Sequence, residues 1–262
     1  MALNTADELT EPFEWPDEGV TRVPFRLISD EEIYALEQQR IFKGPVWNYL
    51  CLEIEIPDPG DFKTTTVGEV PVIITRDENG AIHCMVNRCS HKGALVCLKE
   101  RGNAKALTCV YHAWTYGLDG SLKGVAFKNG VGGKGGMPDD FDTADHSLPT
   151  LRVTTFCGMV FGTFSDATPP IEDFFGAEMS KFLRRNFDRP LKLLGTHSQV
   201  IHNNWKLYAE NVRDSYHATL LHTFYTTFKV NRLDMDGGII LADDKWHHIS
   251  YAKRHTLSED AE

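Results

Sequence analysis

The sequence contains no run of 18 apolar residues, so no segment of it is predicted to span a membrane. Basic residues are scarce: 27 Lys and Arg stand against 37 Asp and Glu, which gives a formal net charge of −10. Because a nucleic-acid-binding surface needs an excess of positive charge, nucleic acid is not an expected partner. The N-terminus has neither the basic start nor the apolar stretch of a signal peptide, which predicts a cytoplasmic protein.

Cysteine is also sparse, since six residues in 262 are too few for a disulfide-stabilised scaffold. Hydrophobic residues make up 42% of the chain and charged residues 24%, proportions that are typical of folded proteins rather than disordered ones. The length predicts one or two domains. In a cytoplasmic chain, neighbouring Cys and His residues indicate metal or redox chemistry.

The first two regions of the chain differ in their residue patterns. Residues 1–44 combine an acidic arm with a helix predicted over residues 29–43, for which Ser29 is the expected N-cap. Residues 45–168 alternate short β-rich runs with turns, and Asn79-Gly80 and Asp119-Gly120 mark the tips of two predicted hairpins. This second region is predicted to be a small all-β domain.

The remaining chain is predicted to hold a linker helix over residues 169–189 and a second domain that begins at residue 190. In this part we expect a strand over residues 191–202, a helix over residues 205–218 capped by Asn203 or Asn204, and a hairpin after Gly237-Gly238.

Two short Cys/His pairs lie in the predicted β domain. Cys89 and His91 form the first pair, and Cys109 and His112 form the second. Two thiolates and two imidazoles suit either a tetrahedral zinc ion or a Rieske [2Fe–2S] cluster, in which two His replace two Cys on one iron. Structural zinc sites usually separate the Cys pair from the His pair, whereas here each loop supplies one of each, which favours the cluster.

A second group of metal-binding residue types lies in the second domain. Asp214 and His217 are spaced to share a helix face, but His222 follows five residues after His217, so we predict that the helix breaks between the two His. Two imidazoles and one carboxylate that leave open positions are typical of non-haem Fe(II) sites that react with O2.

Taken together, these motifs resemble the α subunits of Rieske non-haem iron, aromatic ring-hydroxylating oxygenases. The resemblance includes Ala113-Trp114 after the second pair, and within the family it is strongest to the terephthalate-, anthranilate- and salicylate-hydroxylating enzymes over residues 40–62, 109–127 and 203–228. It implies an α+β fold with an N-terminal all-β Rieske domain, followed by the start of an α+β helix-grip catalytic domain that is truncated here.

The resemblance also implies roles for individual residues. Cys89, His91, Cys109 and His112 would hold the [2Fe–2S] cluster, and His217 and His222 would bind mononuclear Fe(II). Asp214 would be a bridge that contacts an iron-binding His and His112 of the partner subunit; Asn211 would lie near the iron, and Tyr216 would support the site. The third iron ligand of the family is a downstream Asp with no counterpart here, so we expect a partial α subunit that binds mononuclear iron weakly.

The function implied by the resemblance is the dioxygenation of an aromatic carboxylate with O2, in aromatic catabolism. Electrons would come from NADH through a separate reductase, with or without a ferredoxin, and the oligomer would be based on a trimer, with or without a β subunit. Three alternatives remain open at this point: a monooxygenase, a Rieske electron-transfer protein without oxygenase activity, and a structural zinc protein.

Overall fold

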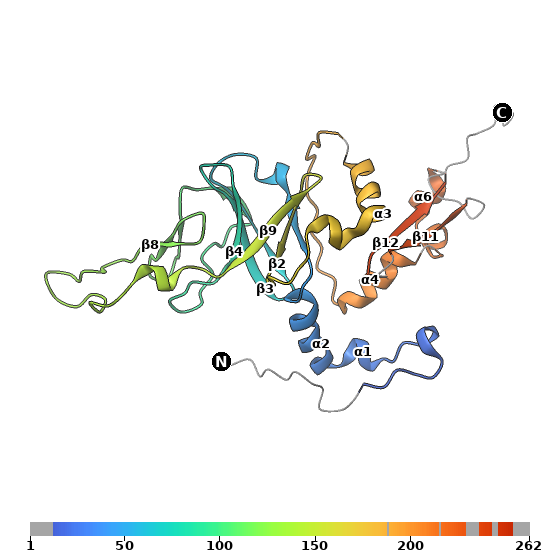
Figure 1. Cartoon of the computed structure of the whole chain (residues 1–262), viewed down its shortest axis with the longest axis horizontal. Coiled ribbons are helices and arrows are strands. Elements are labelled where there is room, and N and C mark those ends of the chain that lie inside the picture. The colour runs from blue at the N-terminus through green and yellow to red at the C-terminus, as the bar shows by residue number, and fades with distance from the viewer. Residues whose placement is uncertain (1–12, 188, 215, 229–235, 243–245, 254–262) are drawn as a thin grey trace. The chain divides into compact units, whose positions relative to one another are not determined.

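The computed structural model describes residues 13–187, 189–214, 216–228, 236–242 and 246–253 (Figure 1). The described residues form two compact units. The first lies within residues 34–174 and 187–196, and the second within residues 13–33, 175–186 and 197–253. No helix in the described ranges is long and apolar enough to cross a membrane.

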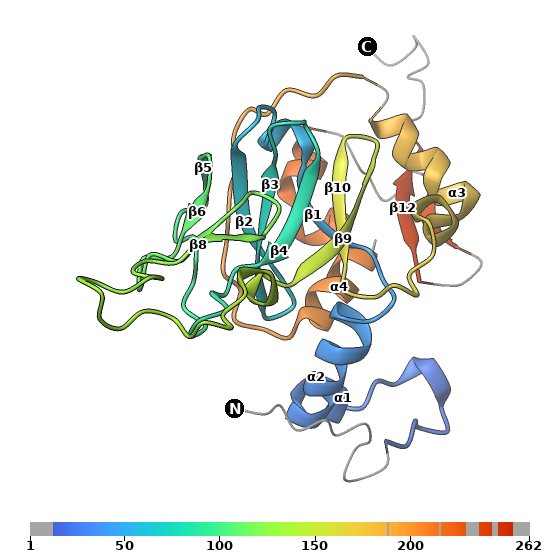
Figure 2. The same cartoon turned by 60° about the vertical axis from the view of Figure 1, so that its left-hand side comes forward.

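The first unit is built around a seven-stranded antiparallel sheet with the strand order β1-β10-β9-β4-β3-β2-β5 (Figure 2). Its strands are β1 (Asn48–Leu52), β2 (Asp61–Val67), β3 (Val70–Arg76), β4 (Ile82–Val86), β5 (Arg101–Asn103), β9 (Thr150–Phe156) and β10 (Met159–Thr163). A smaller sheet contains β6 (Leu107–Thr108), β7 (Thr115–Tyr116) and β8 (Leu122–Gly124). The predicted β-rich character of this region is confirmed, in keeping with the predicted fold class.

The hairpin turns follow the expected glycines. Gly80 joins β3 to β4 and has a φ of +84°, and Gly120 joins β7 to β8 with a φ of +85°. These left-handed conformations are open to glycine at little cost, which is why both hairpins are visible in the sequence.

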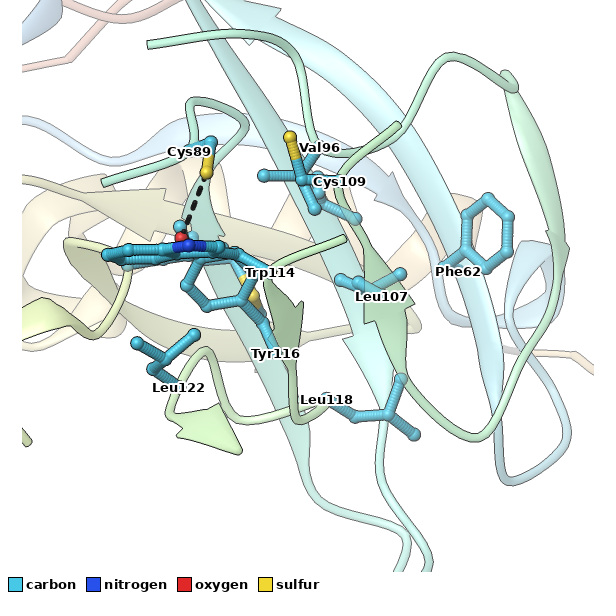
Figure 3. Packing of buried hydrophobic residues seen from close by; sticks show 12 residues of the cluster. Phe62, Cys89, Val96, Leu107, Cys109, Trp114, Tyr116, Leu118 and Leu122 are labelled. Carbon is cyan, nitrogen blue, oxygen red and sulfur yellow. Dashed lines mark hydrogen bonds between the residues drawn. The ribbon is translucent and has the colours of Figure 1, made fainter. Parts of the chain in front are cut away.

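Two hydrophobic clusters cover the two faces of the sheet, and strand β3 contributes to both because its side chains alternate. Val72 and Ile74 belong to one cluster, together with Leu50 and Val160. Ile73 belongs to the other, which also contains both predicted metal-binding cysteines (Figure 3). The Cys/His loops are therefore anchored to a buried face of the sheet.

The N-terminal helical region differs from the prediction at its start. Instead of one helix capped by Ser29, there is a short α1 (Arg26–Ser29), then α2 (Glu31–Glu37) and a π-helical turn over Gln38–Phe42. Oδ1 of Asp30 accepts hydrogen bonds from the backbone N–H groups of Glu32 and Ile33, so Asp30 caps α2. Ser29 fails as a cap because its hydroxyl donates to the carbonyl of Phe25 in the preceding turn.

The helix predicted over residues 169–189 is present as α3 (Ile171–Asn186), and Gly176 kinks it with a φ of +71°. Beyond it, the predicted strand over residues 191–202 is wrong, because these residues form no strand. Asn204 caps α4 (Trp205–Arg213) as expected, through a side-chain bond from the N–H of Lys206. Short helices α5 (Ala218–Leu221) and α6 (Thr223–Thr227) follow, and β11 (Gly237–Leu241) pairs with β12 (His248–Ala252) as the predicted hairpin.

Candidate metal sites

The two Cys/His loops of the first unit are closed by the same pair of backbone hydrogen bonds. The N–H of Cys89 donates to the carbonyl of Ala94, and the N–H of Gly93 donates to the carbonyl of Cys89. In the second loop the N–H of Cys109 donates to the carbonyl of Trp114, and the N–H of Ala113 donates to the carbonyl of Cys109. The cysteines therefore occupy equivalent positions, although the two His lie two and three residues after them.

Each loop needs a left-handed residue at the fourth position after its cysteine. Gly93 adopts it at a φ of +71°, and Ala113 adopts it at +54°, where a side chain normally disfavours this conformation. The strained backbone of Ala113 closes the loop and presents the preceding residue, His112, at the surface.

These loops bring the two candidate imidazole ligands into contact and place the two candidate thiols in one buried cluster. Nδ1 of His91 lies 3.2 Å from Nδ1 of His112, while Cys89 and Cys109 are buried, with exposed fractions of 4% and 2%. Two nitrogens that bind one tetrahedral ion at about 2.0–2.1 Å lie about 3.3 Å apart. The imidazole pair therefore fits a shared metal, although one N–H···N hydrogen bond also reaches this distance. Burial, His112 and Lys92 lower the pKa of His91, which favours its neutral, metal-binding form.

A buried tyrosine supports the thiol side of this site. Oη of Tyr116 lies 3.2 Å from Sγ of Cys89 (Figure 3). The same oxygen accepts a hydrogen bond of 3.1 Å from the N–H of Ser90. A metal-binding thiolate at Cys89 would have no proton to donate, so in that state the Tyr116 hydroxyl would be the donor of this contact. Burial and the Cys89 contact raise the pKa of Tyr116 to about 12, so this donor stays protonated at neutral pH.

The donor set distinguishes between the two metals left open by the sequence. Within the described ranges, no three Cys, His, Asp or Glu side chains converge on the position of a single ion. A tetrahedral zinc site requires four ligands around one ion, whereas a two-iron cluster binds a sulfur pair on one iron and an imidazole pair on the other. The residues therefore fit the [2Fe–2S] group better than zinc.

The second candidate site lies in the second unit, where Nε2 of His217 is 3.2 Å from Nε2 of His222. Nδ1 of His217 is 3.0 Å from Oδ2 of Asp214, and Nδ2 of Asn211 is 3.4 Å from Nε2 of His217. The two facing Nε2 atoms again have the separation expected of two ligands to one ion. The N–H of Tyr216, followed by the contact with His217, lowers the pKa of Asp214, so its carboxylate stays charged.

The backbone brings these residues together differently from the prediction. The helix ends at Arg213, not residue 218, so Asp214 and His217 do not share a regular helix face. Oδ1 of Asp214 instead accepts the N–H of Tyr216 at 2.7 Å, in a turn that returns the chain toward the carboxylate. The expected break is displaced: the predicted helix ends before His217, and His217 and His222 cap the two ends of the four-residue helix α5, so the chain between them is helical.

A cavity of about 510 Å³ opens beside the second site. Helices and strand β12 supply its lining residues, which are Asn211, Val212, Asp214, His217, Ala218, His222, Tyr225, Ser250, Tyr251 and Ala252. No Lys or Arg is among these residues, so the lining supplies no cation for a negatively charged ligand. Tyr216, predicted to support the site, contributes its backbone N–H, while its side chain is 78% exposed.

The other four cysteines, Cys51, Cys84, Cys97 and Cys157, form no disulfide. Cys51 and Cys84 are buried in the hydrophobic cluster that contains Val72 and Ile74. Burial raises the pKa of Cys51 to about 12. Their thiols are therefore unreactive packing groups.

Comparison with known families and proteins identifies the first unit. Residues 46–132 match the Rieske [2Fe–2S] domain. The terminal oxygenase component subunit alpha 2 of terephthalate 1,2-dioxygenase from Comamonas sp. is 49% identical over 239 residues, which cover 91% of this chain and 58% of that protein. The anthranilate 1,2-dioxygenase large subunit of Burkholderia cepacia is 50% identical over 221 residues, covering 84% and 52%.

A third relative and a solved structure agree with these matches. The large oxygenase component of salicylate 5-hydroxylase from Ralstonia sp. is 44% identical over 241 residues, covering 90% of this chain and 57% of that protein. The crystal structure of naphthalene 1,2-dioxygenase from Rhodococcus sp. bound to indole superposes with a TM-score of 0.72 at 29% identity, covering 89% of this chain and 54% of that one.

The fold and the donor set thus define residues 46–132 as a Rieske [2Fe–2S] domain. Over most of its length the chain is similar to Rieske oxygenase α subunits, at 44–50% identity to the three relatives, which is the resemblance that the sequence predicted. It spans about half the length of the curated relatives that it matches.

Proposed function

We propose that the protein is the terminal oxygenase α subunit of a multicomponent, NADH-dependent aromatic ring-hydroxylating dioxygenase. The observation that carries this proposal is that one chain holds two imidazole pairs, each with facing nitrogens 3.2 Å apart, one near two buried thiols and the other near a carboxylate. When bound, a Rieske cluster supplies single electrons and a mononuclear Fe(II) with open positions is suited to O2 chemistry. We assign residues 45–168 to the Rieske domain and residues 190–262 to the start of the catalytic domain.

In this proposal the first set of residues holds the cluster in a mostly buried setting. Cys89 and Cys109 would hold the cluster through their thiolates, and His91 and His112 would hold it through their imidazoles. Tyr116 donates a hydrogen bond to the Cys89 sulfur, which stabilises negative charge there. His112 is exposed, so an electron-transfer partner can approach the imidazole side of the cluster.

The second set of residues would hold Fe(II) through Nε2 of His217 and Nε2 of His222. Oδ2 of Asp214 lies 3.0 Å from Nδ1 of His217, where the carboxylate would favour a proton on Nδ1 and so leave the lone pair on Nε2 for the metal. Asn211 lies beside the same nitrogen. The Asp214 side chain is 47% exposed, and its outer part would meet His112 of the partner subunit in a ring of three copies.

The substrate that we propose is an aromatic carboxylate, and O2 is the second substrate, which supplies the oxygen added to the ring. The names of the relatives support this class, whereas the described cavity lining holds no cation for the carboxylate group. Dioxygenation is the proposed outcome, and analysis of the product for one or two inserted oxygen atoms distinguishes it from monooxygenation. A separate cytoplasmic reductase, with or without a ferredoxin, would deliver electrons.

Iron content tests the proposal directly. Protein isolated without oxygen and supplied with Fe(II) should contain about three irons per chain, two in the cluster and one at the His pair. His217→Ala should lower this to about two, with unchanged visible and EPR spectra of the cluster. His197→Ala, which replaces an exposed His outside both sites, is the matched control. Three irons retained in His217→Ala would contradict the proposed catalytic site.

A second candidate function is an electron carrier that uses the Rieske domain alone. The observation in its favour is that the described residues offer the second metal two imidazoles but no third converging ligand. A wild-type content of two irons, unchanged by added Fe(II), would support the carrier over the oxygenase.

A further inference from the structure

Trp114 covers one face of the imidazole of His91. The two rings are stacked, with centroids 4.9 Å apart and an angle of 11° between their planes, and the indole is only 4% exposed. One of the two candidate imidazole ligands thus has an apolar ring against it instead of water. The position of Trp114 therefore determines how far solvent can reach this side of the metal site.

Two further rings hold Trp114 from its edge. The ring centroid of Phe141 lies 5.8 Å from that of Trp114, and the centroid of His146 lies 5.6 Å from it, at interplanar angles of 79° and 75°. Phe141 and His146 are themselves stacked at 4.6 Å and 10°. Edge-to-face and offset stacked pairs of this kind are favourable arrangements of aromatic rings. We call Phe141 and His146 the aromatic brace.

The brace belongs to an excursion over residues 125–147 that runs between β8 and β9. Gly130, Gly132, Gly133, Gly135 and Gly136 in this excursion all have positive φ, so its backbone is held largely by turns. Near the end of this excursion, side-chain and backbone hydrogen bonds fix the backbone. Asp142 caps a 3-10 turn, Thr143–His146, by accepting the N–H of Ala144 at 2.9 Å, and the N–H of Phe141 donates to Pro138. Both rings of the brace are thereby set in place locally.

We propose that Phe141 and His146 are positioning residues that fix Trp114 against His91 and thereby keep the reduction potential of the cluster low. This inference rests on the proposed function. With two ferric ions, two sulfides, two thiolates and neutral imidazoles, the oxidised group is uncharged, and it gains one negative charge when it accepts one electron. An apolar cover disfavours the charged, reduced form, because the charge is less well solvated.

The test compares the loaded wild-type protein with Phe141→Ala, His146→Ala and His146→Phe. Phe127→Ala is the matched control, since Phe127 lies in the same excursion, is 74% exposed and makes no ring contact with any described residue. Potentials are measured by titration monitored by circular dichroism. We expect both Ala substitutions in the brace to shift the potential to more positive values, and His146→Phe, which keeps the stack, to retain the wild-type potential.

Several outcomes would overturn the inference. Equal potentials in wild type, Phe141→Ala and His146→Ala would do so, and so would an equal shift in Phe127→Ala. A wild-type protein that binds no cluster would instead refute the proposed function. The brace is then judged in the metal-free protein by the solvent exchange rate of the Trp114 indole N–H, measured by NMR. The two Ala substitutions should increase this rate severalfold, and an unchanged rate would refute the brace.

Discussion

Replacing Tyr116 by Phe removes one hydroxyl from a fully buried site that touches the sulfur of Cys89. A hydrogen bond to a charged group contributes about 1.5–3 kcal/mol. If roughly half of this acts on the reduced state alone, where the sulfur carries more negative charge, Tyr116→Phe destabilises the reduced cluster by about 1 kcal/mol. For a one-electron couple, 59 mV corresponds to about 1.4 kcal/mol, so the potential should fall by about 40 mV.

The assay is a redox titration of the loaded protein followed by EPR, with Tyr111→Phe as control. The Tyr111 ring contacts that of His112 at a tilted angle of 33°, but the residue is exposed and its hydroxyl makes no hydrogen bond in the described part of the chain. Because the pKa of Tyr116 is raised to about 12, its donor is present at any lower pH. The difference between wild type and Tyr116→Phe should therefore be constant from about pH 7 to 10. An unchanged or more positive potential in Tyr116→Phe would refute the reasoning.

Three further predictions follow from the same structure. Ala113→Val should destabilise the protein by about 1–3 kcal/mol in chemical unfolding because a β-branched residue is strained at a φ of +54°, whereas Ala113→Gly should not; equal stabilities would contradict this. Asp30→Ala should destabilise the protein at neutral pH. Arg26 and the N–H of Ile33 lower the pKa of Asp30 from its usual 3.8. The difference in unfolding free energy between wild type and Asp30→Ala should therefore vanish only as the pH falls through this lowered pKa. Asp214→Asn should weaken binding of Fe(II) to the second unit about 10–100-fold, measured by titration, and unaltered affinity would exclude its positioning role.

Features that depend on local chemistry were visible in the sequence. The hairpins at Gly80 and Gly120 follow from the need for positive φ, and the cap at Asn204 follows from its side-chain oxygen. The Cys/His spacing likewise pointed to the first site, because both loops supply one thiol and one imidazole. The family was predicted for the same reason, since its motifs are short and local.

Features that depend on the rest of the fold were missed. The apolar residues at 191–202 suggested a strand, but they gain no pairing partner among the described strands. The helix at Asp214 ends early because its carboxylate accepts the N–H of Tyr216, which competes with the helical pattern. Tyr116, Phe141 and His146 reach the first site only through the packing of separate loops, and spacing in the sequence gives no signal for such contacts.

The central claim is that Cys89, His91, Cys109 and His112 hold a two-iron cluster. Its most direct test is EPR of the dithionite-reduced protein, isolated without oxygen, together with acid-labile sulfide analysis of the same sample. The account predicts a rhombic Rieske-type signal and about two sulfides per chain, both lost in Cys109→Ser but retained in Cys97→Ser. A colourless wild-type protein that contains zinc and no sulfide would contradict it.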